Sequence, residues 1–496
     1  MKKILCVLFA LLLTVSGAVL SGCSDKPGDD TTGGNTTTAA SAESGAETME
    51  TEPVETEVKP DLPEVKYTGK TVRFLIMDRA QDDIYTEDHM TNNAMHDAVF
   101  TRNKNVTERY GVTFDIVIDS ETGVPSRLST AVKAGSDEYD ICFTHMVNGS
   151  NNAINNEVLP IDELPYVDLS KPWWDKDVNQ GFSIKEHLMM INGDISPYSF
   201  NYTACMYFNK NLFDKYDLEY PYQLVRDGKW TLDKLIELTK DFTADTDGDG
   251  KITADGGSDV FGMTAWYLGL PYDFYYGAGG MIVSKDQDDV PYYDLQVERD
   301  TAIYDKIYAA VITNQSNYEQ SNWNVPHTLF SSGRALFYDA SLGDGELLRE
   351  MENEYGILPI PKLNEEQKEY KSFVNGASAM ICIPATVRAQ NREFVSVILE
   401  ALASEAYKTV TPVLKETYLK RKYTRDADSM DMLDYVIRNR VFDMGYVFLY
   451  GNVGSYVRDL LVKGTKSISA AVKSYSKTGP KYVERIVKSF DKSLQQ

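Results

Sequence analysis

The sequence predicts an α/β protein with two lobes, and three observations support this. Short apolar runs alternate with helix-like stretches from residue 71 to residue 145, an order typical of a parallel sheet covered by helices. The pattern leaves this region near residues 195 to 203, forms a second α/β region, and returns near residue 340. The chain has 496 residues, more than one ordinary core holds. We therefore expect two lobes that hinge about these crossings, with a ligand cleft between them.

The first lobe begins with five elements in alternation. Residues 72–78 (VRFLIMD) form an apolar strand signal, and residues 94–111 place apolar side chains near helical spacing, with a glycine as the stop. The segments 112–119, 127–135 and 139–145 then predict strand, helix and strand. This order favours a parallel sheet, because parallel strands need a crossover between them.

Strand and helix signals recur through the rest of the chain. Residues 230–243 (WTLDKLIELTKDFT) predict a helix with Thr231 as its N-cap. We expect extended segments at 188–196, 203–213, 259–269, 333–339, 355–362 and 378–384, helix at 299–312, and mostly helical sequence from Ala389. Cys142, Cys205 and Cys382 lie in apolar strand-like runs, which predicts buried thiols.

The N-terminus carries an export signal. Lys2 and Lys3 precede an apolar run that ends in Leu-Ser-Gly-Cys, so residues 1–22 are expected to be a secretory signal peptide. The tetrad resembles a bacterial lipobox, and the run is shorter than the roughly 20 residues that a membrane span needs. We expect Cys23 to carry a lipid that anchors the protein on the outer side of the cytoplasmic membrane.

An acidic segment follows the expected lipid anchor. Residues 23–66 are rich in Ser, Thr and acidic residues and contain no aromatic side chain. This segment has too little apolar surface to offset the conformational entropy that it would lose on ordering, so we expect a disordered tether. The formal net charge of the whole chain is -24, which argues against nucleic acid or an anionic membrane surface as a partner. The net charge does not argue against a neutral ligand.

Several segments are similar to those of a known group of proteins. They are PWWD at 172–175, INGDIS at 191–196, MYFNKNLFDKY at 206–216, the stretch from DGKWT to GDGKIT at 227–253, SSGRALF at 331–337, YGILPIPK at 355–362 and YTRDADSMDML at 423–433. With the lipobox, they resemble extracellular solute-binding proteins (family 1) that feed carbohydrate ABC importers, as maltose-binding protein does. Each segment alone is weak, but together they follow the family order across nearly all of the mature domain.

The resemblance implies a fold, a ligand and a partner. The fold is the two-lobed periplasmic-binding-protein type II fold, with one lobe at 67–197 and 341–384 and the other at 204–338 and 388–496. Members bind a sugar or oligosaccharide between the lobes and present it to an ABC permease. The resemblance therefore implies a monomeric binding protein and no enzymatic reaction.

The stretch DTDGDGKIT at 245–253 predicts a calcium site. Alternate carboxylates converge on one hard cation in an EF-hand-like loop. The expected ligands are Asp245, Asp247, Asp249, the carbonyl of Lys251, and Asp255. Position 12 of the loop is Gly256 rather than Glu, so Asp255 or Asp259 would have to replace the missing carboxylate. A solvated turn rich in Asp and Gly is the alternative. Related alginate-binding members carry a comparable calcium loop, which favours a structural ion.

Candidate ligand-binding residues follow from the chemistry of sugars. Sugars present apolar faces and a rim of hydroxyls, so their sites combine aromatic platforms with polar side chains. The aromatic candidates, around the crossings and in the segment 266–276, are Trp173, Trp174, Tyr198, Tyr202, Trp266, Tyr267, Tyr272, Tyr276, Trp323 and Tyr338. The polar candidates at strand ends are Asp82, Asp83, His145, Asn148 and Asp339. Ordinary packing or a solvated loop is the alternative for each.

Two other functions remain open from the sequence. A secreted glycoside hydrolase needs two carboxylates about 5 to 9.5 Å apart, and among 74 acidic residues some pair always qualifies. The chain contains neither GxSxG nor HExxH. A peptide-binding lipoprotein of similar shape would need charges that pair with peptide termini, and no such pair stands out. Carbohydrate binding is therefore the favoured interpretation.

Overall fold

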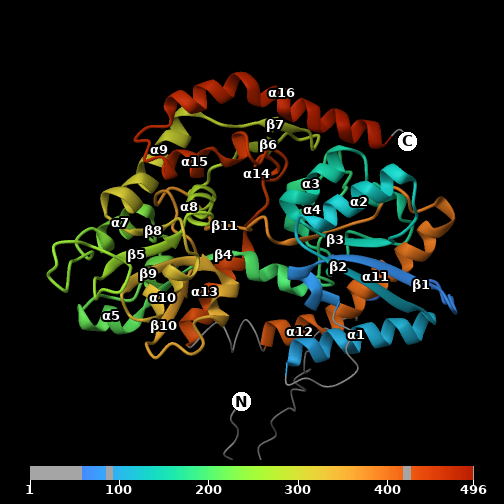
Figure 1. The fold of residues 1–496 in the computed structure, drawn as a ribbon, viewed down its shortest axis with the longest axis horizontal. Coiled ribbons are helices and arrows are strands. Elements are labelled where there is room, and N and C mark those ends of the chain that lie inside the picture. Colours follow the sequence, from blue (N-terminus) through green and yellow to red (C-terminus); the bar gives the residue numbers. More distant parts are fainter. Residues whose placement is uncertain (1–57, 85–92, 417–425, 495–496) are drawn as a thin grey trace, which may run out of the picture. The chain divides into compact units, whose positions relative to one another are not determined.

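The computed structural model describes residues 58–84, 93–416 and 426–494 (Figure 1). The predicted signal peptide, the predicted lipidation site Cys23 and most of the predicted tether lie outside these residues. No helix among the described residues is both long and apolar enough to cross a membrane. The described residues from Val58 onward belong to one compact unit, and they form two sheets of more than two strands.

The first sheet has the strand order β12-β3-β1-β2. β1 (Thr71–Met77) pairs in parallel with β2 (Thr113–Asp119) and β3 (Ile141–His145), while β12 (Ala379–Cys382) is antiparallel to β3. The predicted alternation of strand and helix is confirmed by the intervening helices η1 (Asp78–Ile84), α1 (Ala94–Tyr110) and α2 (Gly123–Ala134) and by α3 (Met146–Ile154), which follows β3. α1 ends at Gly111, whose φ of 68° lies in the left-handed region that favours glycine.

The second sheet has the order β10-β4-β9-β5-β8. β5 (Phe261–Trp266) is parallel to β8 (Asn317–Glu319) and to β9 (Ala335–Ser341). β4 (Ala204–Asn209) is antiparallel to β9 and to β10 (Tyr355–Leu358). The carboxyl ends of β5, β8 and β9 therefore share one edge of this sheet. Helix α8 (Leu270–Gly277) follows β5 at that edge.

The crossings between the two sheets run side by side. The first passes through η3 (Pro197–Tyr202) into β4, and the second leaves β9 through η5 (Leu342–Glu346). β11 (Ser372–Phe373), which precedes β12 of the first sheet, pairs in parallel with β13 (Arg440–Val441). The amide N–H of Asn375 donates to the carbonyl of Tyr202 at 2.9 Å, which ties this third connection to the first.

Two parts of the chain pack differently from the expected division into lobes. β10 lies within 341–384, which was expected in the first lobe, but it pairs with β4 in the second sheet. α11 (Ala389–Thr409) lies within 388–496, which was expected in the second lobe, but it packs on α1. The apolar pattern of a segment does not specify its packing partner, because burial against any apolar surface of suitable shape is favourable.

The end of the predicted tether also differs from the expectation. Leu62 and Val65 are partly buried against the core, and the amide of Tyr67 donates to the carbonyl of Tyr110 at 2.7 Å. The ordered chain therefore begins before residue 67. The three thiols of Cys142, Cys205 and Cys382 are free and buried, which confirms that prediction.

The C-terminal helices connect both sheets. α13 (Ala427–Arg438) packs on β10, α14 (Met444–Phe448) contacts α3, and α15 (Tyr456–Val462) packs on α8. α16 (Ser469–Ser493), drawn in red in Figure 1, contacts β7 (Pro291–Tyr293), α9 (Val297–Tyr308) and α3. The remaining elements are η2 (Ile161–Glu163), α4 (Lys176–Phe182), α5 (Lys210–Lys215), α6 (Tyr222–Arg226), α7 (Leu232–Thr239), β6 (Val283–Lys285), η4 (Ala309–Thr313), α10 (Asn324–Ser331), α12 (Thr411–Val413) and η7 (Val453–Ser455).

Candidate functional site

Two groups of side chains lie where parallel strands end. Ligands of open α/β sheets bind outside the carboxyl ends of the strands, so these groups are the candidate site. The first-lobe cluster follows β1, β2 and β3 and consists of Arg79, Asp82, Glu121, His145 and Asn148. The tyrosine cluster combines a residue of α8, which follows β5, with residues of α14, of the segment after α14, and of α15. It consists of Tyr272, Tyr446, Tyr450 and Arg458, with Phe373 of β11 behind them.

The first-lobe cluster is a polar network. Nε of Arg79 lies 3.1 Å from Oε2 of Glu121, and Nδ2 of Asn148 donates to the carbonyl of Glu121 at 3.2 Å. Nδ1 of His145 accepts the amide N–H of Asn148 at 3.2 Å and so caps α3. Burial, with a smaller effect of the Arg79 charge, lowers the pKa of His145 to about 4, so its imidazole is neutral at pH 7. Tyr202 reaches this cluster from the first crossing, because its hydroxyl hydrogen-bonds to Arg79.

Asp82 and Asp83 are neighbours in sequence but have different surroundings. Oδ2 of Asp82 forms a 3.4 Å ion pair with Nε2 of His96 and stays partly exposed. Asp83 is 1% exposed, and its carboxylate accepts the hydroxyl of Ser196 at 2.5 Å and the amide of Tyr198 at 3.2 Å. Burial raises the pKa of Asp83 to about 7. Asp83 and Tyr198 therefore hold the start of the first crossing in place.

The tyrosine cluster packs four aromatic rings together, mostly edge to face. The ring of Tyr446 lies 4.8 Å from those of Tyr272 and Phe373 and 5.5 Å from that of Tyr450. The guanidinium of Arg458 lies 5.3 Å from the Tyr450 ring and donates to its hydroxyl. Sequence reasoning missed Tyr446, Tyr450 and Arg458, because they lie in helical sequence far along the chain. The available signal in the sequence was the four-residue spacing of Tyr446 and Tyr450, which places two tyrosines on one side of a helical stretch.

Further predicted residues of the second lobe lie in β5, α8 and β9 or directly after them. Trp266 and Tyr267, at the end of β5, pack edge to face at 4.8 Å. Tyr276 is buried and stacks on Phe373 at 4.9 Å. The hydroxyl of Tyr338 donates to Asp344 at 3.1 Å. Asp339 is buried at the end of β9 and hydrogen-bonds to Asp273 in the first turn of α8.

The two clusters meet at a glycine. The amide of Gly376 donates to the hydroxyl of Tyr446 at 3.3 Å. A Cβ at this position would lie 2.5 Å from Cγ2 of Val147 and 2.9 Å from the Tyr446 hydroxyl, so only glycine allows the approach. Val147 stands between His145 and Asn148 of the first-lobe cluster. The hydroxyl of Ser150 in α3 also donates to the carbonyl of Val447 in α14 at 3.2 Å.

Comparison with known proteins agrees with this arrangement. A family model described as bacterial extracellular solute-binding protein matches residues 102–430. The chain belongs to this family. The predicted family membership is thereby confirmed, and membership of an extracellular family indicates that this solute-binding protein works outside the cytoplasm. Comparison with curated protein sequences finds no match.

Solved structures confirm the two-lobed α/β fold of this solute-binding protein. The maltose/maltodextrin-binding domain from Bdellovibrio bacteriovorus bound to maltotriose matches with a TM-score of 0.52 and 13% identity, covering 86% of this chain and 100% of that one. An ABC substrate-binding protein from Listeria monocytogenes in complex with cycloalternan gives 0.52 and 13%, covering 85% and 99%. The GacH receptor of Streptomyces glaucescens, solved unliganded and with acarbose, gives 0.53 and 14%, covering 83% and 98%.

The predicted residues Trp173, Trp174 and Trp323 also belong to neither cluster of the solute-binding protein. Trp173 and Trp174 are 0% and 2% exposed, and their indole N–H groups donate to the two carboxylate oxygens of Glu400 at 2.9 Å each. They therefore pack between the first lobe and α11. Trp323 is 55% exposed at the start of α10.

Two cavities lie on the surface of the first lobe. One, of about 380 Å³, is lined by residues of α1 and β2, including Phe100 and Phe114. The other, of about 460 Å³, is lined by polar residues of α2 and α3 and includes Asn148. Only the second cavity therefore touches a cluster at the strand ends.

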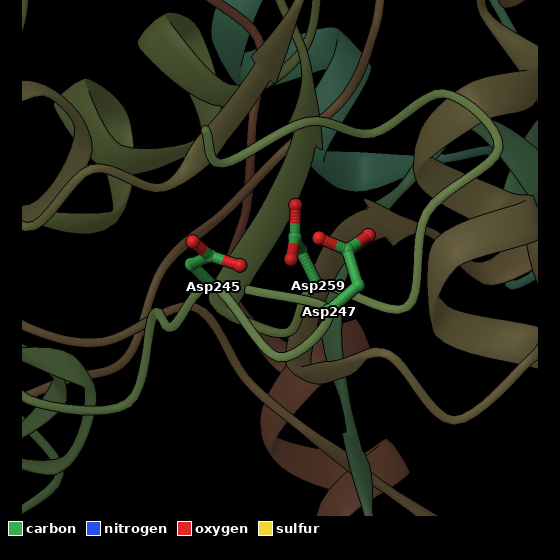
Figure 2. Close-up of side chains that lie close together, drawn as sticks. All are labelled: Asp245, Asp247 and Asp259. Atoms are coloured by element: carbon green, nitrogen blue, oxygen red, sulfur yellow. The ribbon is translucent and has the colours of Figure 1, made fainter. Parts of the chain in front are cut away.

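The aspartate loop brings three carboxylates together. Figure 2 shows Asp245, Asp247 and Asp259, whose carboxylate oxygens lie within 4.8 Å of one another. The amides of Thr253 and Thr246 donate to the buried Asp259 at 2.8 and 3.0 Å, and these hydrogen bonds lower its pKa. Oxygen ligands that stay ionised suit a hard cation such as calcium.

The other predicted metal ligands are not part of this carboxylate group. Oδ1 of Asp249 accepts the amide of Lys251 at 2.8 Å, and the carbonyl of Asp255 accepts the Thr253 hydroxyl at 3.2 Å. Of the two carboxylates considered for the missing twelfth position, the structure brings Asp259 and not Asp255 into the group. After the loop the chain reverses direction before it enters β5. This reversal brings Asp259 back to Asp245 and Asp247.

Proposed function

We propose that this protein is the lipid-anchored, substrate-binding component of an ABC importer and that it binds a sugar or oligosaccharide between its two clusters. The observation that carries the proposal is the tyrosine cluster itself. Four packed rings stand beside a cation and a buried carboxyl pair, next to the polar network of the first lobe. Aromatic faces take the apolar faces of sugars, and the polar groups take their hydroxyls.

The proposed geometry explains how the ligand would be held. The first-lobe cluster offers charged and amide groups through Arg79, Glu121 and Asn148, while the second lobe offers rings through Tyr446 and Tyr450. A saccharide touching both groups gains contacts from each lobe and so favours their closed arrangement. The solved structures with bound maltotriose, cycloalternan and acarbose support a saccharide as the ligand class.

Saccharide binding is tested by thermal melting in a panel of oligosaccharides. A true ligand at a hundredfold excess over its dissociation constant stabilises the protein by about 2.7 kcal/mol. Tyr450→Ala should weaken binding about fivefold, because the loss of a stacked ring costs about 1 kcal/mol. Tyr482→Ala on α16 is the matched control, since Tyr482 is 36% exposed and Tyr450 is 37% exposed. Failure of every saccharide to raise the melting temperature, or release of product from chromogenic glycosides, would refute the proposal.

We also propose a structural calcium ion in the aspartate loop. Asp245, Asp247 and Asp259 would bind it and stabilise the connection between α7 and β5. EGTA should lower the melting temperature of the wild-type protein, and Asp259→Asn should abolish this response. Asp255→Asn serves as the control, because its carboxylate is not in the group. An EGTA response that persists in Asp259→Asn would contradict the site.

We also propose that a lipid on Cys23 anchors the protein to the membrane. Cys23 follows an export signal, and Cys23→Ser should move the protein from the membrane fraction to the soluble fraction of cells. Saccharide affinity of the variant should be unchanged, because the anchor is remote in sequence from both clusters. Continued membrane association of the Cys23→Ser protein would argue against lipidation at this residue.

A further inference from the structure

A polar groove runs between α2 and α3 on the surface of the first lobe. Each helix follows a strand whose carboxyl end carries the first-lobe cluster, so both helices lead away from the same edge of the sheet. The groove is the cavity of about 460 Å³ that residues of these helices line. Asn148 belongs to the first-lobe cluster and also lines this cavity, so the groove begins at the candidate site.

The α3 wall of the groove is a row of asparagines. Asn148, Asn151, Asn152 and Asn155 have the spacing of residues on one side of a helix, and all four line the cavity. From Asn148 to Asn155 the row covers about two helical turns, roughly 10 Å. The row therefore continues the candidate site along α3 beyond the edge of the sheet.

Buried polar side chains form the floor of the groove. Asn152 is 3% exposed, and its Nδ2 donates to the carbonyl of Pro125 at 3.0 Å and to Oε2 of Glu157 at 2.7 Å. Glu157 is 4% exposed, and its Oε1 accepts the hydroxyl of Ser129 at 2.8 Å and lies 3.5 Å from Nζ of Lys133. These contacts join α2 to the end of α3 and fix the floor in place.

The groove also holds hydrogen-bonding groups that the protein does not use. Asn151 and Asn155 are exposed, and within the described part of the chain their side chains make no hydrogen bond. Each of these amides offers two donors and one acceptor. On the floor, Oδ1 of Asn152 has no partner among the described residues, which is rare for a buried polar atom. These groups leave room for a ligand that both donates and accepts hydrogen bonds.

The composition of the groove favours a neutral ligand rich in hydroxyls. The described residues that line it include no Lys, Arg or aromatic side chain, and the carboxylate of Glu157 already has partners. An anionic ligand therefore finds no cation there, and an apolar one finds little besides Pro125. Protein interfaces are enriched in aromatic, Met and Arg side chains, which this lining lacks. Amides and hydroxyls match the hydroxyl rim of a sugar.

We propose, resting on the proposed saccharide-binding function, that this groove binds the outer units of a neutral oligosaccharide whose inner units lie between the two clusters. The ligand would leave the candidate site past Asn148 and continue along Asn151 and Asn155. Without an aromatic ring the groove contributes hydrogen bonds alone, so it adds affinity for a long ligand and does not hold a short one by itself.

Titration calorimetry with short and long saccharides of the same linkage tests the proposal. The probes are maltose and maltohexaose, cellobiose and cellohexaose, and β-1,4 mannobiose and mannohexaose. In a series that binds, the wild-type protein should hold the hexamer at least about tenfold more tightly than the dimer, because the groove adds two or more hydrogen bonds. Asn151→Ala and Asn155→Ala should each weaken hexamer binding about fivefold and leave dimer binding unchanged.

A blocking variant and a control complete the set. Ser126→Leu places a larger side chain without hydrogen-bonding groups in the groove, and should bring hexamer affinity close to that of the dimer. Asn105→Ala is the matched control, because Asn105 is exposed on α1 of the same lobe and does not line the groove. All the substituted positions are exposed, so melting temperatures without ligand should stay near that of the wild type.

The outcomes separate this inference from the proposed function. Equal affinity for dimer and hexamer, or a hexamer preference that Asn151→Ala, Asn155→Ala and Ser126→Leu leave unchanged, would overturn the extended site and leave the function standing. Unchanged binding of both lengths together with lost sugar uptake by cells carrying Ser126→Leu would assign the groove to the permease instead. Absence of binding in all three series would also overturn this inference, and the melting panel then shows whether the function stands.

Discussion

The indole pair Trp173 and Trp174 and the tyrosine cluster are both aromatic and mostly buried, but their polar atoms differ. Both indole N–H groups donate to Glu400 at 2.9 Å, so the pair is satisfied within the protein. The hydroxyl of Tyr272 is equally buried and has no partner among the described residues. Both groups are buried, so burial does not distinguish them, and the partners of their polar atoms are what differs between the indole pair and the proposed binding surface.

The largest expected effect concerns the satisfied pair. Glu400→Ala removes the acceptor of both indoles and of the Asp168 amide, and leaves three buried or half-buried donors without a partner. We expect the free energy of unfolding to fall by about 3 to 5 kcal/mol, measured by urea denaturation. Glu393→Ala, at an exposed position of the same helix, should change it by less than about 0.5 kcal/mol. Equal losses in the two variants would mean that the indole pair is not held by Glu400.

A pH dependence should follow from the same carboxyl group. Burial raises the pKa of Glu400 to about 7 from its ordinary 4.5, although its three hydrogen bonds lower it. Because the folded pKa is the higher one, the contribution of this group to stability is complete below about pH 4.5 and is lost as the pH rises through 7. We expect wild-type stability to lose about 2 kcal/mol more between pH 5 and pH 8 than that of Glu400→Gln. Parallel pH profiles for the two proteins would contradict the raised pKa.

Removing the unused hydroxyl should affect binding more than folding. Tyr272→Phe deletes an atom without a described partner, so the free energy of unfolding should stay within about 0.5 kcal/mol of wild type. Saccharide affinity should fall about fivefold, because one ligand hydrogen bond is worth about 1 kcal/mol. Trp174→Phe should show the opposite pattern in calorimetry and denaturation, losing stability but not affinity. Reversal of these patterns would show that the unused polar atom does not mark the ligand site.

The smallest effect is expected at the exposed Trp323. Its side chain is 55% exposed at the start of α10 and contacts neither cluster. Trp323→Ala should leave both the melting temperature and the saccharide affinity nearly unchanged. A clear drop in affinity would instead assign Trp323 to the ligand site, as the sequence first suggested.

Local patterns predicted the elements of the fold well. The alternation from residue 71 to residue 145 matches β1 to β3 and their helices, because apolar spacing reports which face of an element is buried. The same patterns misplaced β10 and α11, since neither apolar spacing nor capping residues state which sheet or helix lies opposite. The aspartate loop was recognised from its spacing, while Asp259 joins the carboxylate group only because the chain folds back.

What the sequence by itself determined is the family, the order of strands and helices, and the chemistry available at their ends. Those features depend on residues close together in the chain, such as the alternate aspartates and the polar residues after each strand. The tertiary structure alone decided that Tyr446 and Arg458 lie with Tyr272, that Trp173 and Trp174 turn inward to Glu400, and that Asp273 meets Asp339. These contacts join residues far apart in sequence, and only the packing of α8, α11, α14 and α15 against the two sheets brings them together.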